Sequence, residues 1–191
     1  KRICIIAFKD AQSTIHVLRQ IHYLSPHYDL TVVAHGSPDP AWANVTWRSI
    51  PRATLLSKIT RLVCYALARL IPAVGEAWYW RTPRFRAAYA AALASGCDAL
   101  HANDWQALPI AVEVARRTGA RVVFHQHEYA ELEREDNPIW RLLVSPAIHR
   151  LLVKYTSDPE VPIDAFITVC EPIAERYRRE SALAGGVEGG I

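Results

Sequence analysis

Short apolar runs alternate along this chain with longer segments in which apolar residues recur every three or four positions. The short runs predict strands at 2–8, 30–34, 45–50, 98–102, 121–125 and 165–169. The longer segments have a helical period and predict helices at 13–24, 54–71, 84–95, 105–118, 139–155 and 172–181. Nearly continuous apolar strands that are separated by helices are typical of a parallel sheet covered on both faces. The pattern therefore predicts an α/β fold with a mainly parallel sheet.

The length and the chain ends bear on domain organisation. The chain has 191 residues, which suits one domain or two small ones. We place the domain at residues 1–181 and interpret the Gly-rich stretch 182–191 as a linker towards a further domain. The longest stretch without charged residues, 87–97, is much shorter than the roughly 20 apolar residues that cross a membrane. Because no signal-like segment precedes the first strand, we expect a cytoplasmic protein.

Several functional classes lack their characteristic motifs. The turn after the first strand reads KDAQS at 9–13, without the glycines that let a dinucleotide cofactor approach the backbone. No phosphate-binding loop of the ATPase type is present. The four cysteines lie far apart, without the spacing of a zinc or redox site. The net charge is +3, and no nucleic-acid-binding motif accompanies it. We therefore expect no cofactor, no metal and no nucleic-acid partner.

Polar side chains follow several of the predicted strands. In an open α/β sheet, ligands bind beyond the carboxyl ends of the strands. The candidate binding residues at this edge are Ser13, Asn103, Asp104, Trp105, His127, Glu128 and Glu171. Two alternatives stay open, because Asp104 and Glu171 could instead cap or stabilise the helices that follow them. A metal held by His125 and His127 with His101 and Asp104 is less favoured, since their spacing matches no known zinc pattern.

The segment from Arg52 to Arg86 contains seven basic residues and a single acid, Glu76. On the predicted helix 54–71, Lys58, Arg61 and Arg69 form one stripe, and the apolar residues lie opposite. Such a helix could lie on an anionic membrane or contact an anionic acceptor. We favour an ordinary helix that buries its apolar face against the sheet and keeps its charges in water.

Two segments resemble a known family. HANDWQALPIAVEVARRTGARVVFHQHEYAELE at 101–133 and ITVCEPIAERYRRE at 167–180 are similar to the N-terminal domain of family 4 glycosyltransferases of the GT-B fold. That family typically has a strand ending in H-A-x-D-W, a strand ending in D-A-H-E, and a later strand ending in V-S-E. This chain departs from the pattern at His125-Gln126, where the family has Asp-Ala, and at Cys170, where it has Ser.

The resemblance implies a Rossmann-like three-layer domain that forms one half of a GT-B enzyme and binds the acceptor. A second domain would bind the nucleotide-sugar donor, and transfer to an acceptor hydroxyl on a glycan, lipid or small molecule would retain anomeric configuration without a metal. His127 matches the family histidine that reaches the donor sugar, and Glu128 matches its acidic neighbour. The fragment alone is then expected to be inactive.

Two other functions stay open. The chain could be a carbohydrate- or anion-binding α/β module without catalysis. It could also belong to another GT-B enzyme, such as a sugar-nucleotide epimerase, which would convert a sugar nucleotide without any acceptor.

Overall fold

A computed structural model describes residues 1–10, 14–127, 130, 136–180 and 187–189. The strands are β1 (Arg2–Asp10), β2 (Asp29–His35), β3 (Thr46–Ser49), β4 (Ala99–Asn103), β5 (Arg121–Gln126), β6 (Ala165–Thr168) and β7 (Val187–Gly189). The α-helices are α1 (Ile15–Leu24), α2 (Leu55–Leu67), α3 (Ala73–Arg81), α4 (Pro83–Ala94), α5 (Asp104–Thr118), α6 (Ser145–Thr156) and α7 (Glu171–Glu180). A short 3-10 helix, η1 (Pro40–Trp42), and a π-helical turn, η2 (Trp140–Val144), complete the elements.

The strands that the structure describes form one sheet in the order β3-β2-β1-β4-β5-β6-β7. All of its pairings are parallel. The strand order reverses between β1 and β4, where the chain passes from one half of the sheet to the other. In parallel α/β sheets, this point opens a crevice for ligands at the carboxyl ends of the strands.

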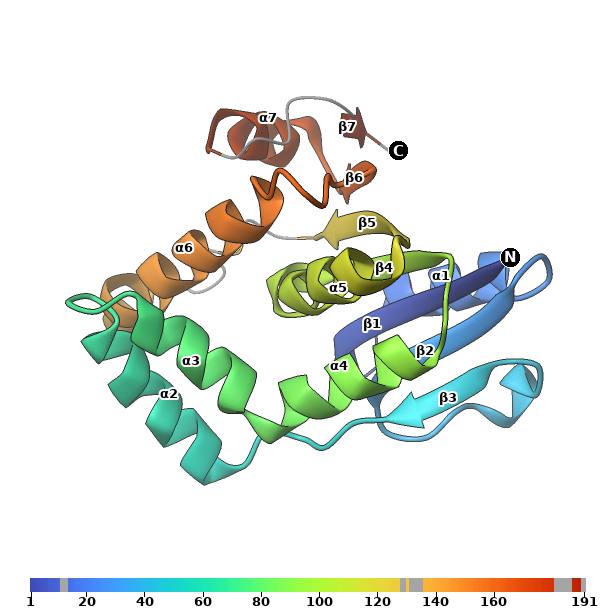
Figure 1. The fold of residues 1–191 in the computed structure, drawn as a ribbon, viewed down its shortest axis with the longest axis horizontal. Helices are drawn as coiled ribbons and strands as arrows, with labels where there is room; N and C mark the ends of the chain where they lie inside the picture. The colour runs from blue at the N-terminus through green and yellow to red at the C-terminus, as the bar shows by residue number, and fades with distance from the viewer. Residues whose placement is uncertain (11–13, 128–129, 131–135, 181–186, 190–191) are drawn as a thin grey trace.

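Alternate residues of β1 point to opposite faces of the sheet and join two separate cores. Ile5 and Ala7 pack with α1 in the smaller core, whereas Cys4, Ile6 and Phe8 belong to the larger core. Figure 1 shows α1 behind the sheet and α4 and α5 in front of it. The side-chain period of two along a strand therefore produces the three-layer α/β/α arrangement that the sequence predicts.

The expected strands are all present, and the helices differ from expectation at several places. Helix α2 ends at Leu67, before the expected end at 71. Helix α3 lies between Pro72 and Pro83, in a stretch for which no helix was predicted because its apolar residues lack a 3.6 period. The expected helix at 139–155 begins with the π-helical turn η2. Residues 187–189, which lie inside the Gly-rich stretch, pair with β6 as the short strand β7.

The expectation that the apolar face of the second predicted helix packs on the sheet is wrong. Helix α2 packs against α3 and η2 instead, at the outer edge of the molecule (Figure 1). Its inward side carries Arg61 and the buried Tyr65, with Ala68 just beyond the helix end. Its apolar stripe faces outward, so that Leu56 is 70% exposed and Ile59 is 52% exposed.

Candidate functional site

A cluster of histidines lies where β4 and β5 end and α1 begins. The His127 ring stacks on His16 of α1 with 3.9 Å between ring centroids, and it lies 4.1 Å from the His125 ring. His125 lies 5.5 Å from His101 of β4. Side chains that are far apart in sequence therefore meet at the carboxyl edge of the sheet, as the topology requires.

Burial keeps these imidazoles neutral at neutral pH. Desolvation lowers the pKa of His101 and of His125 to about 3, and each ring feels a neighbouring imidazole as a second, smaller cause. Desolvation, followed by His16 and Lys9, lowers the pKa of His127 to about 4. A neutral imidazole has one N–H donor and one acceptor nitrogen, which is the combination that a sugar hydroxyl can use.

His127 is 7% exposed, and neither of its ring nitrogens has a hydrogen-bond partner among the described residues. Buried polar groups are normally paired, and an unpaired one calls for an explanation. A ligand that donates a hydrogen bond to one ring nitrogen and accepts one from the other would satisfy both nitrogens.

A hydrogen-bonded amide pair orients His125. Gln20 of α1 donates from Nε2 to Asn103 Oδ1 at 2.8 Å, and Asn103 donates from Nδ2 to Gln20 Oε1 at 2.9 Å. Gln20 Nε2 also lies 2.7 Å from His125 Nδ1. Because the amide nitrogen can only donate, His125 Nδ1 accepts and its ring proton lies on Nε2. Asn103, which is 1% exposed, therefore holds the site together from within the fold.

Asp104 has an unusual backbone conformation, with a φ of 62°. It is the first residue of α5, so the helix begins one residue earlier than predicted, and the capping position falls to Asn103. The Asp104 carboxylate lies 3.6 Å from Lys9 Nζ at the end of β1. A left-handed conformation is energetically costly for a residue other than glycine, and strained residues of this kind cluster at active sites and ligand-binding segments.

Two other predicted residues lie away from this cluster. Trp105 is 2% exposed and belongs to the larger core, so its indole offers a substrate almost no surface. Glu171 is exposed in the first turn of α7, where it accepts a hydrogen bond of 2.6 Å from Arg178. Its position suits the favourable interaction of an acid with a helix N-terminus. Ser13 and Glu128 lie outside the described residues.

The three basic residues of the predicted stripe are not equivalent. Arg69 donates to the backbone carbonyl of Leu142 in η2. Lys58 and Arg61 instead line a small hollow together with Arg84 of α4. The basic side chains of this stripe therefore contact or adjoin other elements of the protein and are not all directed into water.

Sequence reasoning missed the contribution of α1. His16 and Gln20 come from the same face of this helix, four residues apart, and both reach the carboxyl edge. Their spacing was the available signal, because residues i and i+4 share one side of a helix. With Arg19 and His101, they also line a larger hollow of about 880 Å³ between α1 and strands β4 to β6.

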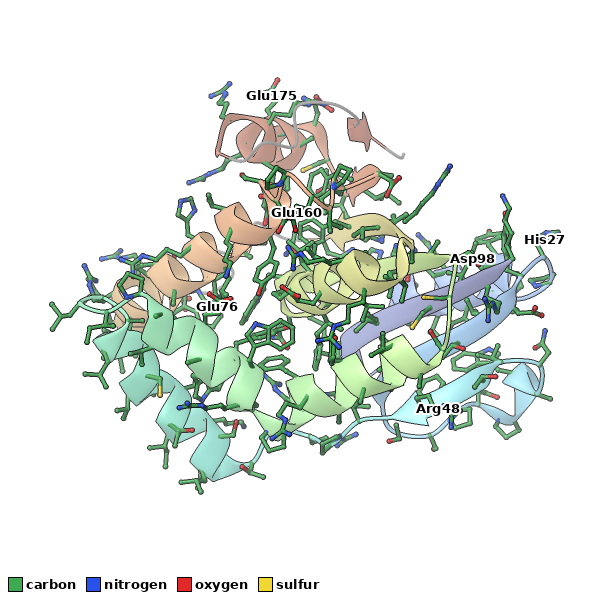
Figure 2. All side chains as sticks on the ribbon, in the orientation of Figure 1. His27, Arg48, Glu76, Asp98, Glu160 and Glu175 are labelled. Atoms are coloured by element: carbon green, nitrogen blue, oxygen red, sulfur yellow. The ribbon has the colours of Figure 1, made fainter. Side chains whose placement is uncertain are left out.

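Within the described ranges, no group of three or more His, Cys, Asp or Glu side chains is placed to hold a metal ion. No helix in the described part of the chain is long and apolar enough to cross a membrane. Figure 2 shows Glu76 on α3 and Glu160 on the segment that follows α6, apart from one another in this view.

No protein-family model matches the sequence, and no curated protein matches it significantly. Solved structures do resemble the fold. A sucrose-phosphate synthase from Thermosynechococcus elongatus superposes with a TM-score of 0.54 at 13% identity, over 99% of this chain and 87% of the other. The glycosyltransferase SsfS6 from Streptomyces sp. SF2575 gives a TM-score of 0.53 at 14% identity, over 90% of this chain.

The chain spans 51% of the SsfS6 chain, which is about half its length. At such low identity, these similarities establish the fold alone: a Rossmann-like α/β domain similar to domains of these two enzymes.

Proposed function

We propose that this chain is the acceptor-binding N-terminal half of a glycosyltransferase that moves a sugar from a nucleotide-sugar donor to an acceptor hydroxyl. One observation carries the proposal. His127 is buried at the carboxyl edge of a GT-B-like sheet, and neither ring nitrogen has a partner among the described residues. Its match to the family histidine supports the same reading.

In this proposal the donor binds mainly to a second domain, and transfer retains anomeric configuration without a metal. His127 hydrogen-bonds the transferred sugar as a neutral imidazole, since its pKa is lowered to about 4. An N–H donor near the leaving phosphate would stabilise developing negative charge. Glu128 follows His127 directly in the sequence and is proposed to act beside it.

Acceptor binding is assigned to the residues around the strand reversal. Asp104, held by Lys9, would accept a hydrogen bond from an acceptor hydroxyl. Asn103 acts as a positioning residue, because it fixes Gln20 and through it His125. Ser13 and Glu171 remain candidates for peripheral contacts.

The test is transfer of labelled sugar from a panel of nucleotide-sugars, measured with the whole protein that carries this chain. His127→Ala should lower kcat about 10²- to 10³-fold, because a preorganised hydrogen bond to the transition state is lost. His127→Gln should retain more activity than His127→Ala, because an amide can still donate without a charge.

His22→Ala is the matched control, because this histidine is exposed on the same helix as His16. Its kcat should be unchanged. Unaltered turnover of His127→Ala, with the fold intact by circular dichroism, would remove His127 from the mechanism. Conversion of a sugar nucleotide without any acceptor would replace transfer by an epimerase-like reaction.

A further inference from the structure

A small hollow lies between α2, α3, α4 and the first turn of α5, apart from the histidine cluster. Its volume is about 220 Å³. Three cationic side chains line it, Lys58 and Arg61 from α2 and Arg84 from α4, together with Trp78 and Gln106. The sequence suggested that Lys58 and Arg61 act together, but it gave no sign that Arg84 joins them.

Arg84 is a buried cation, and no carboxylate in the described part of the chain forms an ion pair with it. Its side chain is 8% exposed, and its guanidinium carbon lies 4.5 Å from the centre of the Phe85 ring and 5.6 Å from that of Phe8. No described carboxylate pairs with it, and its buried Nε has no hydrogen-bond partner among the described residues. Burial, and then the charge of Arg61, lower the pKa of Arg84.

The segment of sequence that supplies Lys58 and Arg61 has no acidic residue. Residues 40–75 contain no Asp or Glu. The Tyr65 hydroxyl and Gln106 Oε1 are also buried without a hydrogen-bond partner in the described part of the chain. A buried charge is tolerated when it is paired, and removing its partner is strongly unfavourable. An anion from outside the chain would supply the missing partner.

The side chains also indicate which anion fits. Guanidinium groups bind phosphate through two parallel hydrogen bonds, and a lysine adds a point charge. The hollow is smaller than the roughly 300–1,000 Å³ of sites that enclose a whole small molecule. It therefore suits one charged group of a larger ligand, with Gln106 Oε1 free to accept a hydrogen bond from a ligand hydroxyl.

We propose that Lys58, Arg61 and Arg84 form a binding site for the phosphate group of a phosphorylated ligand. Gln106 lies in the first turn of α5, which begins where β4 ends, so the site adjoins the carboxyl edge of the sheet. The proposal concerns binding and does not depend on glycosyl transfer.

The test is saturable binding of inorganic phosphate, followed by the shift in Tm at constant ionic strength and by calorimetry. Phosphate should raise the Tm of the unaltered chain, because it binds the folded state alone. Lys58→Gln and Arg61→Gln should each weaken phosphate binding about tenfold, as expected for the loss of one charge-assisted hydrogen bond.

The variant Arg84→Met distinguishes an effect on phosphate binding from an effect on the stability of the fold. Methionine keeps the apolar stem against Phe85 and removes the unpaired charge, so the Tm without phosphate should stay or rise while the phosphate-dependent shift disappears. Arg48→Gln is the matched control, since Arg48 is exposed on β3 and lies away from α2 (Figure 2). Phosphate binding that is absent, or that Arg48→Gln weakens as much as Lys58→Gln, would overturn the proposal.

The source of the phosphate is decided by two further probes. Glycerol 3-phosphate represents a soluble phosphate ester, and phosphatidylglycerol in phosphatidylcholine vesicles represents a lipid headgroup. If glycerol 3-phosphate binds as tightly as the vesicles, or more tightly, the site is assigned to a free phosphorylated ligand. Much tighter binding to the vesicles, lost in Arg84→Met, assigns it to a lipid.

A different observation carries a second inference. The α2 apolar face, defined as Leu55, Leu56, Ile59, Val63 and Leu67, is 49 to 74% exposed. Two apolar residues that follow α2 are also exposed, Leu70 at 84% and Ile71 at 59%. Exposed apolar surface of this extent marks an interaction site.

The charges around this face favour an anionic bilayer as its partner. Lys58 is exposed beside the apolar stripe, and Arg69, just beyond the end of α2, is exposed while it donates to the Leu142 carbonyl. No acid lies within residues 40–75. A helix with an apolar face and flanking basic residues binds in the interface of anionic membranes. In Figure 1, strands β1 and β5 point towards the end of the molecule at which α2 lies. We infer that the α2 apolar face docks on an anionic lipid surface.

Cosedimentation with vesicles tests this inference. The chain should bind vesicles of phosphatidylcholine with about 30% phosphatidylglycerol, bind pure phosphatidylcholine more weakly, and lose affinity as salt is raised. The double variant Ile59→Glu, Val63→Glu should abolish binding. Tyr23→Glu is the control, because Tyr23 is 69% exposed on α1.

Absence of vesicle binding by the unaltered chain would overturn the inference. So would a self-associating chain that becomes monomeric in the Ile59→Glu, Val63→Glu variant, measured by sedimentation velocity, because the α2 apolar face would then be an interface between copies.

Discussion

Burial sets the chemistry of single residues in the histidine cluster. His101, His125 and His127 are packed so that the charged imidazolium is disfavoured, and the pKa of each lies well below its ordinary value. They therefore act as neutral hydrogen-bonding groups at neutral pH. At Asp104 the backbone is strained, because its φ is positive, and its carboxylate lies beside Lys9.

These lowered pKa values predict how stability depends on pH. In the unfolded chain the three histidines take up protons below about pH 6.5, whereas in the folded chain they do so only near pH 3 to 4. The unfolded state therefore binds more protons in this range, and the free energy of unfolding falls as the pH is lowered. Each histidine contributes a slope of up to about 1.4 kcal/mol per pH unit.

Urea unfolding at a series of pH values between about 5 and 7 measures this slope, above the range in which carboxylates titrate. His125→Gln should reduce the slope, because one buried imidazole is removed. His22→Gln, at an exposed position on α1, should leave it unchanged. Equal slopes for the unaltered chain and His125→Gln would show that burial of this ring does not oppose its charge.

At the scale of elements, helix α2 is unusual because it buries very little of its surface. Helix α5 follows the ordinary rule and buries most of its residues, from Ala107 to Ala115, against the sheet and α6. Helix α2 has just one buried residue, Tyr65. The two helices therefore have opposite relations to the core.

A matched pair of substitutions tests this difference. Leu108→Ala in α5 should lower the free energy of unfolding by about 2–5 kcal/mol, because Leu108 is fully buried and its loss leaves a cavity. Leu56→Ala in α2 should change it by less than about 0.5 kcal/mol, because Leu56 is 70% exposed. Chemical denaturation measures both, and a large loss in Leu56→Ala would place the α2 apolar face inside the core.

At the scale of the whole molecule, the parallel sheet gathers distant residues at one edge. His16 of α1, His101 of β4 and His125 of β5 meet because α1 begins at the edge where β4 and β5 end. The basic hollow adjoins this edge through Gln106 of α5. The carboxyl edge of the sheet therefore carries the histidine cluster, and the proposed phosphate site adjoins it.

The sequence by itself determined the order of strands and helices and the residues at the strand ends, because side-chain periods of 2 and 3.6 are local properties. His127, Asp104 and Asn103 could be selected in this way. Helix α3 could not be, since its buried residues follow no single period. The burial of Trp105 was also hidden, because its position at a strand end says nothing about the direction of its side chain.

Only the tertiary structure decided which side of α2 faces the protein. A helical pattern shows that two faces differ but not which of them has a packing partner. Helix α2 packs on α3 and η2 through the side that carries Tyr65, while Leu55, Leu56 and Leu67 are exposed. The same holds for Arg84 and for the pair His16 and Gln20, whose neighbours come from distant parts of the chain. Contacts between elements depend on how the layers pack, which is a property of the whole fold.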